Sequence, residues 1–285
     1  MSKMMSYGKR LGKEFKEDRA TGLAAEQAYY YMLSIFPMLI LLLSILPYLQ
    51  IDPQQAIKFL ESVMPSGTAK TFEKQVVNIV SSKNGGLLTF GIIGTIWSAS
   101  NGMKAFMTSM NKAYDVDETR SFIKKRLIAI LLTLGMIIAL VVALLLPVFG
   151  NVIMDLVKSI MPMPNQMEIV FSVLRWVVAI IVMAAILTAL YRFAPNKHFK
   201  IKHVIPGAII ATVLWQLVSL GFSFYVSNFG SYSETYGSLG GVIVLMLWFF
   251  LTGLVLVLGG EINALFHKYK RDRDSSQNDG RTVTT

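Results

Sequence analysis

The chain has 285 residues, of which 54% are hydrophobic and only 15% are charged, and it contains no cysteine. Soluble domains carry about 25% charged residues, so this composition indicates a membrane protein, and the missing cysteines exclude disulfides, thiolate metal sites and cysteine nucleophiles. The net charge of +10 does not by itself indicate a nucleic-acid partner, because the basic residues gather beside the apolar blocks.

The N-terminal residues 1–27 precede the first apolar block and include YGKRLGKEFKED, in which Leu11 and Phe15 stand among charged residues. This pattern predicts a cytoplasmic helix lying at the membrane interface. The first apolar block is longer than the core of a signal peptide, and no A-x-A-like cleavage site follows it. We therefore expect the first span to remain as an anchor.

Long apolar blocks predict membrane-spanning helices, because each has about 20 residues or more and can cross a hydrocarbon layer of ~30 Å. The predicted spans are residues 28–49, 87–106, 127–149, 169–191, 207–228 and 239–262. Helices satisfy their own backbone hydrogen bonds in lipid, and barrel strands would alternate with a period of two, which these blocks do not. The predicted fold class is all-α, a polytopic membrane helix bundle with six transmembrane helices.

Short amphipathic outer helices are also predicted. Apolar residues recur at helical spacing within residues 53–64, 72–80 and 153–160, which favours helices that lie on lipid or cover the bundle. Residues 28–266 are thus expected to form a six-span membrane domain. The polar residues 267–285 predict a disordered cytoplasmic tail.

Lysine and arginine predict the orientation of the chain. The N-terminal segment, the second and fourth connections and the tail hold 21 of them, whereas the other connections hold five. The positive-inside rule therefore places both termini in the cytoplasm. Basic flanks of this kind contact anionic lipid on the cytoplasmic face, so membrane lipids and no nucleic acid are the expected partners.

Polar side chains at membrane depth are the candidate functional residues. The candidate polar path or buried charge cluster consists of Ser98, Asn101, Arg175 and Glu261. Small and hydroxylated residues around Ser98 and Asn101 suit either close helix packing or a polar patch on a solute path. Arg175 can also extend towards lipid headgroups.

Glu261 stands in VLGGEINALF at the end of an apolar run and allows three interpretations. It can be an interfacial carboxylate beside Lys104 or Arg192, or a buried partner of one of these residues or of Arg175. In the third interpretation it binds a cation or a proton, because ionisable residues within membranes are commonly functional.

Other motifs support packing rather than chemistry. Gly237 and Gly241 stand four residues apart where the sixth span begins, a spacing that allows close helix contact. His198, His203 and His267 are interpreted as ordinary loop or tail residues, because a metal site needs three or four converging ligands. No motif of a soluble enzyme is present, so we expect no catalytic, metal-binding or cofactor-binding site.

Several segments, taken in order, resemble the YihY/BrkB family of bacterial inner-membrane proteins. They are AYYYMLSIFPMLILLLSILPYL, TIWSASNGMKAFMTSMNKAY, YRFAPN with IPGAIIATVLWQ, and YGSLGGVIVLMLWFFLTGLVLVLGGEINALF. The resemblance implies six spans and cytoplasmic termini in the bacterial inner membrane. Family members sometimes carry a ribonuclease BN label, which these residues do not support, because a metal nuclease needs converging acidic or histidine ligands.

The leading hypothesis is a non-enzymatic multi-pass cell-membrane protein that transports a solute, an ion or a lipid-like amphiphile, or supports envelope integrity through such transport. The alternative is a non-transporting scaffold for an envelope-assembly complex, with envelope proteins or further copies of the chain as partners. A membrane-bound ribonuclease is the least favoured hypothesis. A transporter needs a cavity that reaches Glu261, whereas a scaffold can have a closed interior.

Overall fold

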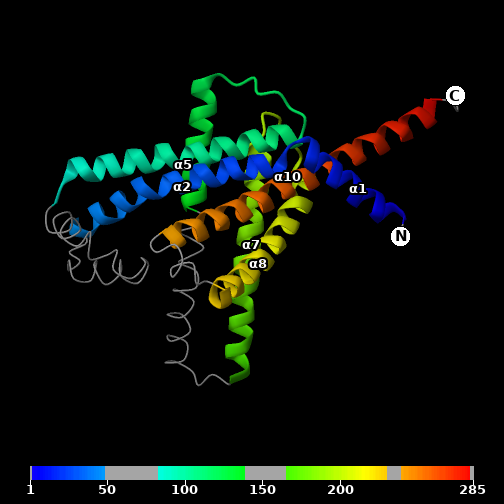
Figure 1. Ribbon diagram of the computed structural model, residues 1–285. Coiled ribbons are helices and arrows are strands. Elements are labelled where there is room, and N and C mark those ends of the chain that lie inside the picture. Colours follow the sequence, from blue (N-terminus) through cyan, green and yellow to red (C-terminus); the bar gives the residue numbers. More distant parts are fainter. Residues whose placement is uncertain (1, 49–82, 139–164, 230–238, 283–285) are drawn as a thin grey trace. The chain divides into compact units, whose positions relative to one another are not determined.

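The computed structural model describes residues 2–48, 83–138, 165–229 and 239–282, and every regular element among them is helical (Figure 1). The all-α prediction is therefore confirmed for this part of the chain. The predicted outer helices at 53–64, 72–80 and 153–160, and Gly237, lie outside it.

The described helices are long and follow one another along the chain. They are α1 (Ser2–Glu17), α2 (Ala20–Ile45) with the 3₁₀ turn η1 (Leu46–Tyr48), α5 (Gly85–Ala113), α7 (Asn165–Phe193), α8 (Ile201–Phe229) and α10 (Leu239–Thr282). Residues 122–138 are also helical. Helix α2 begins at Ala20, earlier than the predicted start of the first span at residue 28.

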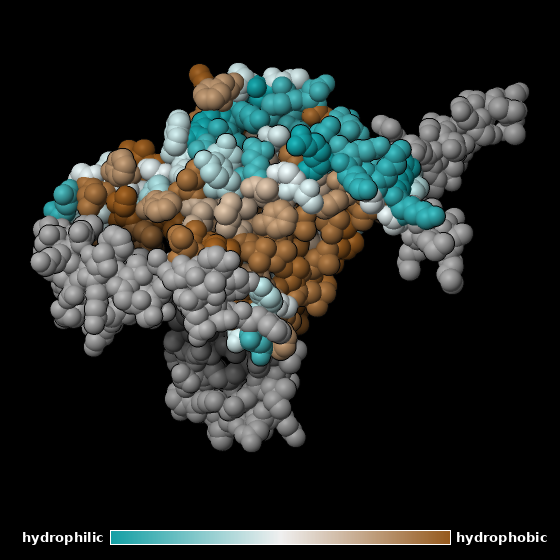
Figure 2. All heavy atoms as spheres, in the orientation of Figure 1, coloured by the Kyte–Doolittle hydropathy of each residue, from teal (hydrophilic) through white to brown (hydrophobic). Residues whose placement is uncertain are grey.

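Among the described residues, three helical stretches are long and apolar enough to cross a membrane: Ala20–Tyr48, Ile201–Asn228 and Leu239–Lys270. They cover the predicted first, fifth and sixth spans. A shorter apolar helix, Val177–Phe193, covers part of the predicted fourth span. Large apolar side chains such as Phe36, Ile181 and Leu220 are exposed on these helices, and Figure 2 shows broad brown areas of such residues. Exposed apolar area of this extent indicates contact with lipid rather than water.

Local sequence explains several helix ends. The Oδ1 atom of Asn84 accepts a hydrogen bond from the backbone N–H of Leu87 at 2.9 Å, which caps the start of α5. Ser121 contacts the backbone N–H of Lys124 in the same way at 3.4 Å, where the helix at 122–138 begins. Helix α1 ends at Glu17 because Arg19 adopts a left-handed backbone conformation, with φ of 53°.

The chain divides into two compact units. The second unit contains residues 19–106 and 215–256, and glycines allow its helices to approach closely. A Cβ atom on Gly91 of α5 would lie 2.9 Å from the Cα atom of Leu41 on α2, and one on Gly253 of α10 would lie 2.9 Å from the carbonyl oxygen of Ala24. Small residues of this kind at helix contacts are typical of membrane proteins.

The first unit contains residues 1–18, 107–214 and 257–285, and the segment Val257–Leu265 of α10 lies in its core. Gly259 packs against Tyr191 of α7 and Ala211 of α8, and Gly260 packs against Met110 of α5. Side chains from three other helices therefore meet α10 at its paired glycines, directly before Glu261.

Helix α10 continues past residue 266 to Thr282, although the sequence predicted a disordered tail from residue 267. Two contacts hold the first polar turn onto α1: the Tyr269 ring stacks on Tyr7 with centroids 4.2 Å apart, and Lys268 forms an ion pair with Glu14 at 3.3 Å. Helix growth from a packed helix needs no new nucleus, so polar residues can extend α10.

Candidate functional site

Glu261 is buried in the first unit, where it contacts a second acidic residue, Asp18. Glu261 is 1% exposed and Asp18 is 6% exposed. Asp18 is the charged group that acts most strongly on Glu261, and two carboxyl groups in contact can share a hydrogen bond only when one of them carries a proton. We refer to Asp18 and Glu261 together as the carboxyl pair.

Both members of the carboxyl pair come from positions that the local sequence defines. Asp18 occupies the break between α1 and α2, where its backbone N–H still donates to the Glu14 carbonyl at 2.8 Å. Glu261 follows Gly259 and Gly260 on α10, and these glycines let neighbouring helices approach its backbone. The acid is therefore held in a packed interior rather than at a solvated helix end.

Charged residues surround the carboxyl pair. Lys112 lies 3.6 Å from Asp18, and Lys268 lies 3.3 Å from Glu14 and 2.8 Å from Asp115. Within the described part of the chain, we define an acidic cluster of four carboxyl groups and the three basic groups paired with them, namely Glu14, Asp18, Asp115, Glu261, Arg10, Lys112 and Lys268. If every group were ionised, negative charge would be in excess, which favours uptake of a proton or another cation.

Some polar atoms of this region make no hydrogen bond within the described residues. They are Oε1 of Glu261, Oδ2 of Asp18 and Nδ2 of Asn263, all buried. The other amide atom of Asn263, Oδ1, accepts the backbone N–H of Gly207 at 2.7 Å. Buried polar groups normally have partners, so atoms such as these indicate a place where a proton, a water or an ion binds.

Burial raises the pKa of the Asp18 carboxyl above its ordinary value. Lys112 acts in the opposite direction, and the nearby carboxylates of Asp115 and Glu14 raise the pKa further. Loss of water around a carboxylate disfavours its charged form. A change in the position of Lys112 would therefore change how readily Asp18 takes up a proton.

Asp115 reaches this cluster through an unusual backbone conformation, with φ of 51°. Helix α5 ends here in a Schellman motif, in which the backbone N–H of Val116 donates to the Asn111 carbonyl at 2.9 Å and that of Asp115 to the Lys112 carbonyl at 3.1 Å. Glycine is the usual residue at this position. Aspartate places a carboxylate 2.8 Å from the Lys268 ammonium group instead.

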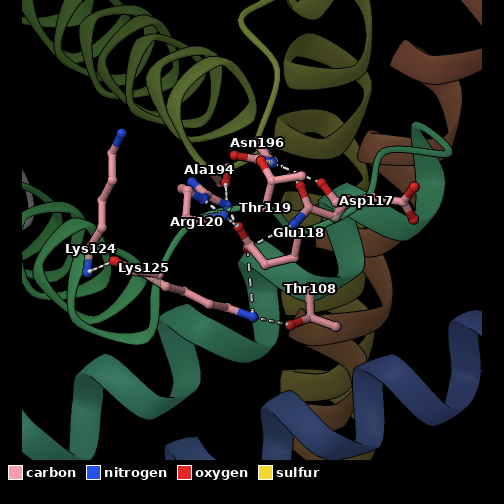
Figure 3. Close-up of polar contacts among 11 residues, drawn as sticks. Thr108, Asp117, Glu118, Thr119, Arg120, Lys124, Lys125, Ala194 and Asn196 are labelled. Atoms are coloured by element: carbon pink, nitrogen blue, oxygen red, sulfur yellow. Dashed lines mark hydrogen bonds and ion pairs between the residues drawn. The ribbon is translucent and has the colours of Figure 1, made fainter.

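A second polar network fixes the loop that follows α5 (Figure 3). Arg120 donates from Nε and Nη2 to the two carboxylate oxygens of Glu118, at 2.7 and 2.8 Å, and these hydrogen bonds lower the pKa of the Glu118 carboxyl. The Arg120 guanidinium also donates to the Ala194 carbonyl at 3.1 Å. The loop is therefore tied to the connection between α7 and α8.

Asn196 completes this network from the other connection. Its side-chain amide donates to the Asp117 carbonyl at 2.8 Å and to the Thr119 hydroxyl at 2.7 Å. Its backbone N–H donates to Oδ1 of Asn111 at 2.7 Å, and Asn111 in turn donates to Glu118 at 3.0 Å. Residues separated by about 80 positions thus form one rigid polar surface.

Two histidines that were interpreted as loop or tail residues lie on helices and contact each other. His203 of α8 and His267 of α10 have their Nδ1 atoms 3.1 Å apart, and Phe199 packs against the His267 ring. Among the described residues, no three His, Cys, Asp or Glu side chains come together in a way that could hold a metal ion. Here a single N–H···N hydrogen bond accounts for the short distance.

The predicted site residues fall into different parts of the structure. Ser98 and Asn101 lie on α5 in the second unit and are half-buried, whereas Arg175 and Glu261 belong to the first unit. The placement of the Arg175 side chain lies outside the described part. A common polar path through these four residues therefore stays a prediction.

Glu261 has charged neighbours that the sequence did not indicate, and its pairing with Lys104, Arg192 or Arg175 stays a prediction. The groups that act on it electrostatically are Asp18, Glu14 and Lys268. Sequence reasoning missed Asp18 and Glu14 because they lie on the N-terminal segment and carry the same charge sign as Glu261. The available signal was an aspartate at the junction between the amphipathic segment and the first apolar block.

Close helix contacts on α10 are made at glycines that the four-residue spacing did not indicate. Gly241 is exposed at the beginning of α10. The tight contacts on α10 come instead from Gly253, Gly259 and Gly260. The packing role predicted for Gly237 and Gly241 stays a prediction, because Gly237 lies outside the described residues.

The long apolar helices and their exposed apolar surfaces define the chain as an α-helical membrane protein. The family model described as "Virulence factor BrkB" matches residues 11–282, nearly the whole length. The chain therefore belongs to the BrkB virulence-factor family, also named YihY/BrkB or UPF0761.

Relatives in several bacteria extend this result. The chain is 44% identical over 272 residues to the Bacillus subtilis protein named "Putative ribonuclease-like protein YfkH", covering 95% of this chain and 99% of that protein. It is 26% identical to a UPF0761 membrane protein of Photobacterium profundum, covering 97% and 85%. A UPF0761 membrane protein of Xanthomonas axonopodis is 24% identical over 92% of this chain and 61% of its own length. No solved structure matches the chain.

Proposed function

We propose that this chain transports a small solute, an ion or a lipid-like amphiphile at the bacterial inner membrane, and that the carboxyl pair binds and releases a proton during transport. The observation that carries this proposal is the buried contact between Asp18 and Glu261. Ionisable side chains within membrane proteins are costly and commonly form proton relays.

The surrounding charges support a proton rather than a fixed counter-ion. Lys112 is more than half exposed and lies 3.6 Å from Asp18, so this ion pair is loose. Lys268 is shared between Glu14 and Asp115. Lys112 can therefore turn to solvent, and Lys268 can remain with Glu14 or Asp115. The carboxyl pair can gain or lose a proton as these two lysines move.

The proposal includes the six-span topology with both termini in the cytoplasm. In this topology α1 lies at the inner interface, where its basic residues contact anionic lipid. The carboxyl pair then stands at the cytoplasmic end of the membrane domain, at the junction of α1, α5 and α10. A proton site at this position would control opening towards the cytoplasm.

We further propose that the chain is not an enzyme. The ribonuclease-like description belongs to the name of the Bacillus subtilis relative. The alternative for this chain is a non-transporting scaffold, which would use envelope proteins or further copies of the chain as partners. The two hypotheses differ in what they require of Glu261, because a scaffold needs its shape and a transporter needs its proton.

The test replaces Glu261 by glutamine, with Glu17→Gln as a matched control on the exposed surface of α1. Glutamine keeps the size and most hydrogen bonds but cannot exchange a proton. We expect Glu261→Gln to accumulate in the membrane at the normal level and to fail to rescue the envelope phenotype of a deletion strain. Glu17→Gln should rescue it fully.

Infrared spectroscopy of the purified protein provides the direct readout. A protonated carboxylic acid has a carbonyl band that is distinct from carboxylate bands, and this band should be present near neutral pH and absent in Glu261→Gln. Full rescue by Glu261→Gln at normal abundance would support the scaffold instead. Absence of the band from the unmodified protein would show that the pair holds no proton.

A further inference from the structure

An open pocket with a volume of about 400 Å³ lies in the first unit, at the end of α5 and the loop after it. Its charged lining residues are Lys112, Lys125, Asp115, Asp117 and Glu118. A pocket of this size is within the range that small ligands occupy. The lining contains both signs of charge, which restricts the chemistry of a ligand.

The two lysines of the pocket are held loosely. Lys125 lies 3.6 Å from Glu118 and 3.5 Å from the Thr108 hydroxyl, and Lys112 lies 3.6 Å from Asp18. These distances are longer than those of good hydrogen bonds, and an ammonium group has three donors. Both lysines can therefore turn towards an anionic group at small cost.

The carboxylates of the pocket are held differently. Glu118 is held by the two hydrogen bonds from Arg120, as Figure 3 shows, so its carboxylate keeps a fixed position in the lining of the pocket. Asp115 and Asp117 are exposed. Asp115 is paired with Lys268 at 2.8 Å, so a cationic group that enters the pocket would meet the carboxylate of Asp117, while an anionic group would be drawn to the lysines.

We propose that this pocket binds a zwitterionic phosphoethanolamine group, with its phosphate at Lys112 and Lys125 and its ammonium group at Asp117. A simple anion would be repelled by the carboxylates, and a metal cation would be repelled by the lysines. A ligand that carries both charges a few bonds apart satisfies both sets. Lysine suits a phosphate group as a mobile point charge.

The pocket also shares residues with the acidic cluster. Lys112 pairs with Asp18 of the carboxyl pair, and Asp115 pairs with Lys268. A phosphate that draws Lys112 away from Asp18 would favour protonation of that carboxyl group, so ligand binding and proton binding are linked. This linkage rests on the proposed function, whereas binding in the pocket does not.

The test measures binding of glycerophosphoethanolamine to the purified full-length protein in detergent by calorimetry. Three comparison ligands each carry one sign of charge. Inorganic phosphate and glycerophosphoglycerol carry only negative charge, and ethanolamine carries only the positive charge. Lys125→Ala and Asp117→Asn should each weaken binding about fivefold or more. Lys124→Ala is the matched control, because Lys124 is the adjacent lysine and points away from Lys125 in Figure 3.

A lipid arm distinguishes the source of the group. In nanodiscs that contain phosphatidylethanolamine, the soluble probe should bind more weakly than in nanodiscs of phosphatidylglycerol alone if the pocket takes a lipid headgroup, and equally if it takes a free metabolite. Either result is compatible with the zwitterionic site. Equal binding of inorganic phosphate, equal effects of Lys124→Ala and Lys125→Ala, or no binding of the probe would overturn it. None of these results depends on rescue by Glu261 variants.

Discussion

Asp115 and Asp18 each combine a position at the end of a helix with a carboxylate that contacts a lysine. Each stands at or beside a left-handed residue that ends a helix, since φ is 51° at Asp115 and 53° at Arg19 next to Asp18. A side chain in this conformation costs roughly 1–2 kcal/mol relative to the right-handed one. Keeping an aspartate instead of glycine at position 115 is consistent with a use for its carboxylate, which contacts Lys268.

Substitution of Asp115 separates these two contributions. Asp115→Gly removes the backbone strain and an exposed ion pair of about 0–1 kcal/mol, so its thermal stability in detergent should equal or exceed that of the unmodified protein. Asp115→Ala keeps the strain, loses the ion pair and should be less stable than Asp115→Gly by about 1 kcal/mol. A higher melting temperature for the alanine variant than for the glycine variant would contradict the left-handed geometry.

Helices α8 and α10 approach each other closely at Gly207, whereas further along the two helices Trp215 and Phe222 pack against Trp248. A Cβ atom on Gly207 would overlap with the backbone carbonyl of Gly259 and would lie 2.5 Å from Cγ of Asn263. The same approach allows the Gly207 N–H to reach Asn263. Close backbone contact and a buried side-chain hydrogen bond therefore position the turn of α10 that carries Glu261.

Replacing Gly207 by alanine should force α8 and α10 apart. Overpacking of this kind costs about 1–3 kcal/mol, and the hydrogen bond to Asn263 would also be lost. We expect lower membrane abundance and a lower melting temperature for Gly207→Ala. The control is Gly221→Ala on the same helix, where nothing lies within 4 Å of the added carbon. That change should be neutral or slightly stabilising, and equal losses for both variants would argue against tight packing at Gly207.

At the scale of the whole molecule, the proposed orientation places basic connections on the cytoplasmic side. The polar network of Glu118, Arg120 and Asn196 joins two of these connections. The predicted topology thus assigns both of them to one side of the membrane, which agrees with their direct contact inside the first unit.

Single introduced cysteines test the orientation, because the natural chain has none. Cysteines at Ser82 and Ser233 should react with an impermeant thiol reagent in intact cells. Cysteines at Asp117 and Ser275 should react only after the membrane is opened. The reverse labelling pattern would show that the charge distribution was misread.

Much of the architecture could be predicted from the sequence because it depends on local properties. Apolar blocks as long as Ala20–Tyr48 and Leu239–Lys270 form helices in lipid whatever their neighbours are, since lipid offers no partners to backbone groups. The all-α class and the membrane location follow from residue types and their order, whereas the sequence left three interpretations of Glu261 open and the structure shows that it is buried. The family resemblance rests on the same ordered segments.

The surroundings of Glu261 could be decided only by the tertiary structure. Asp18 and Glu14 meet it through the packing of the N-terminal segment on α10, which lies far away in the chain, whereas Lys268 is on the same helix as Glu261. No local pattern in the sequence records the contact with the two acidic residues. The same holds for His203 with His267 and for Asn196 with Asp117. Periodicity determines which face of a helix is apolar, but the choice of a partner depends on side-chain shape and on glycines such as Gly259 that let particular helices approach.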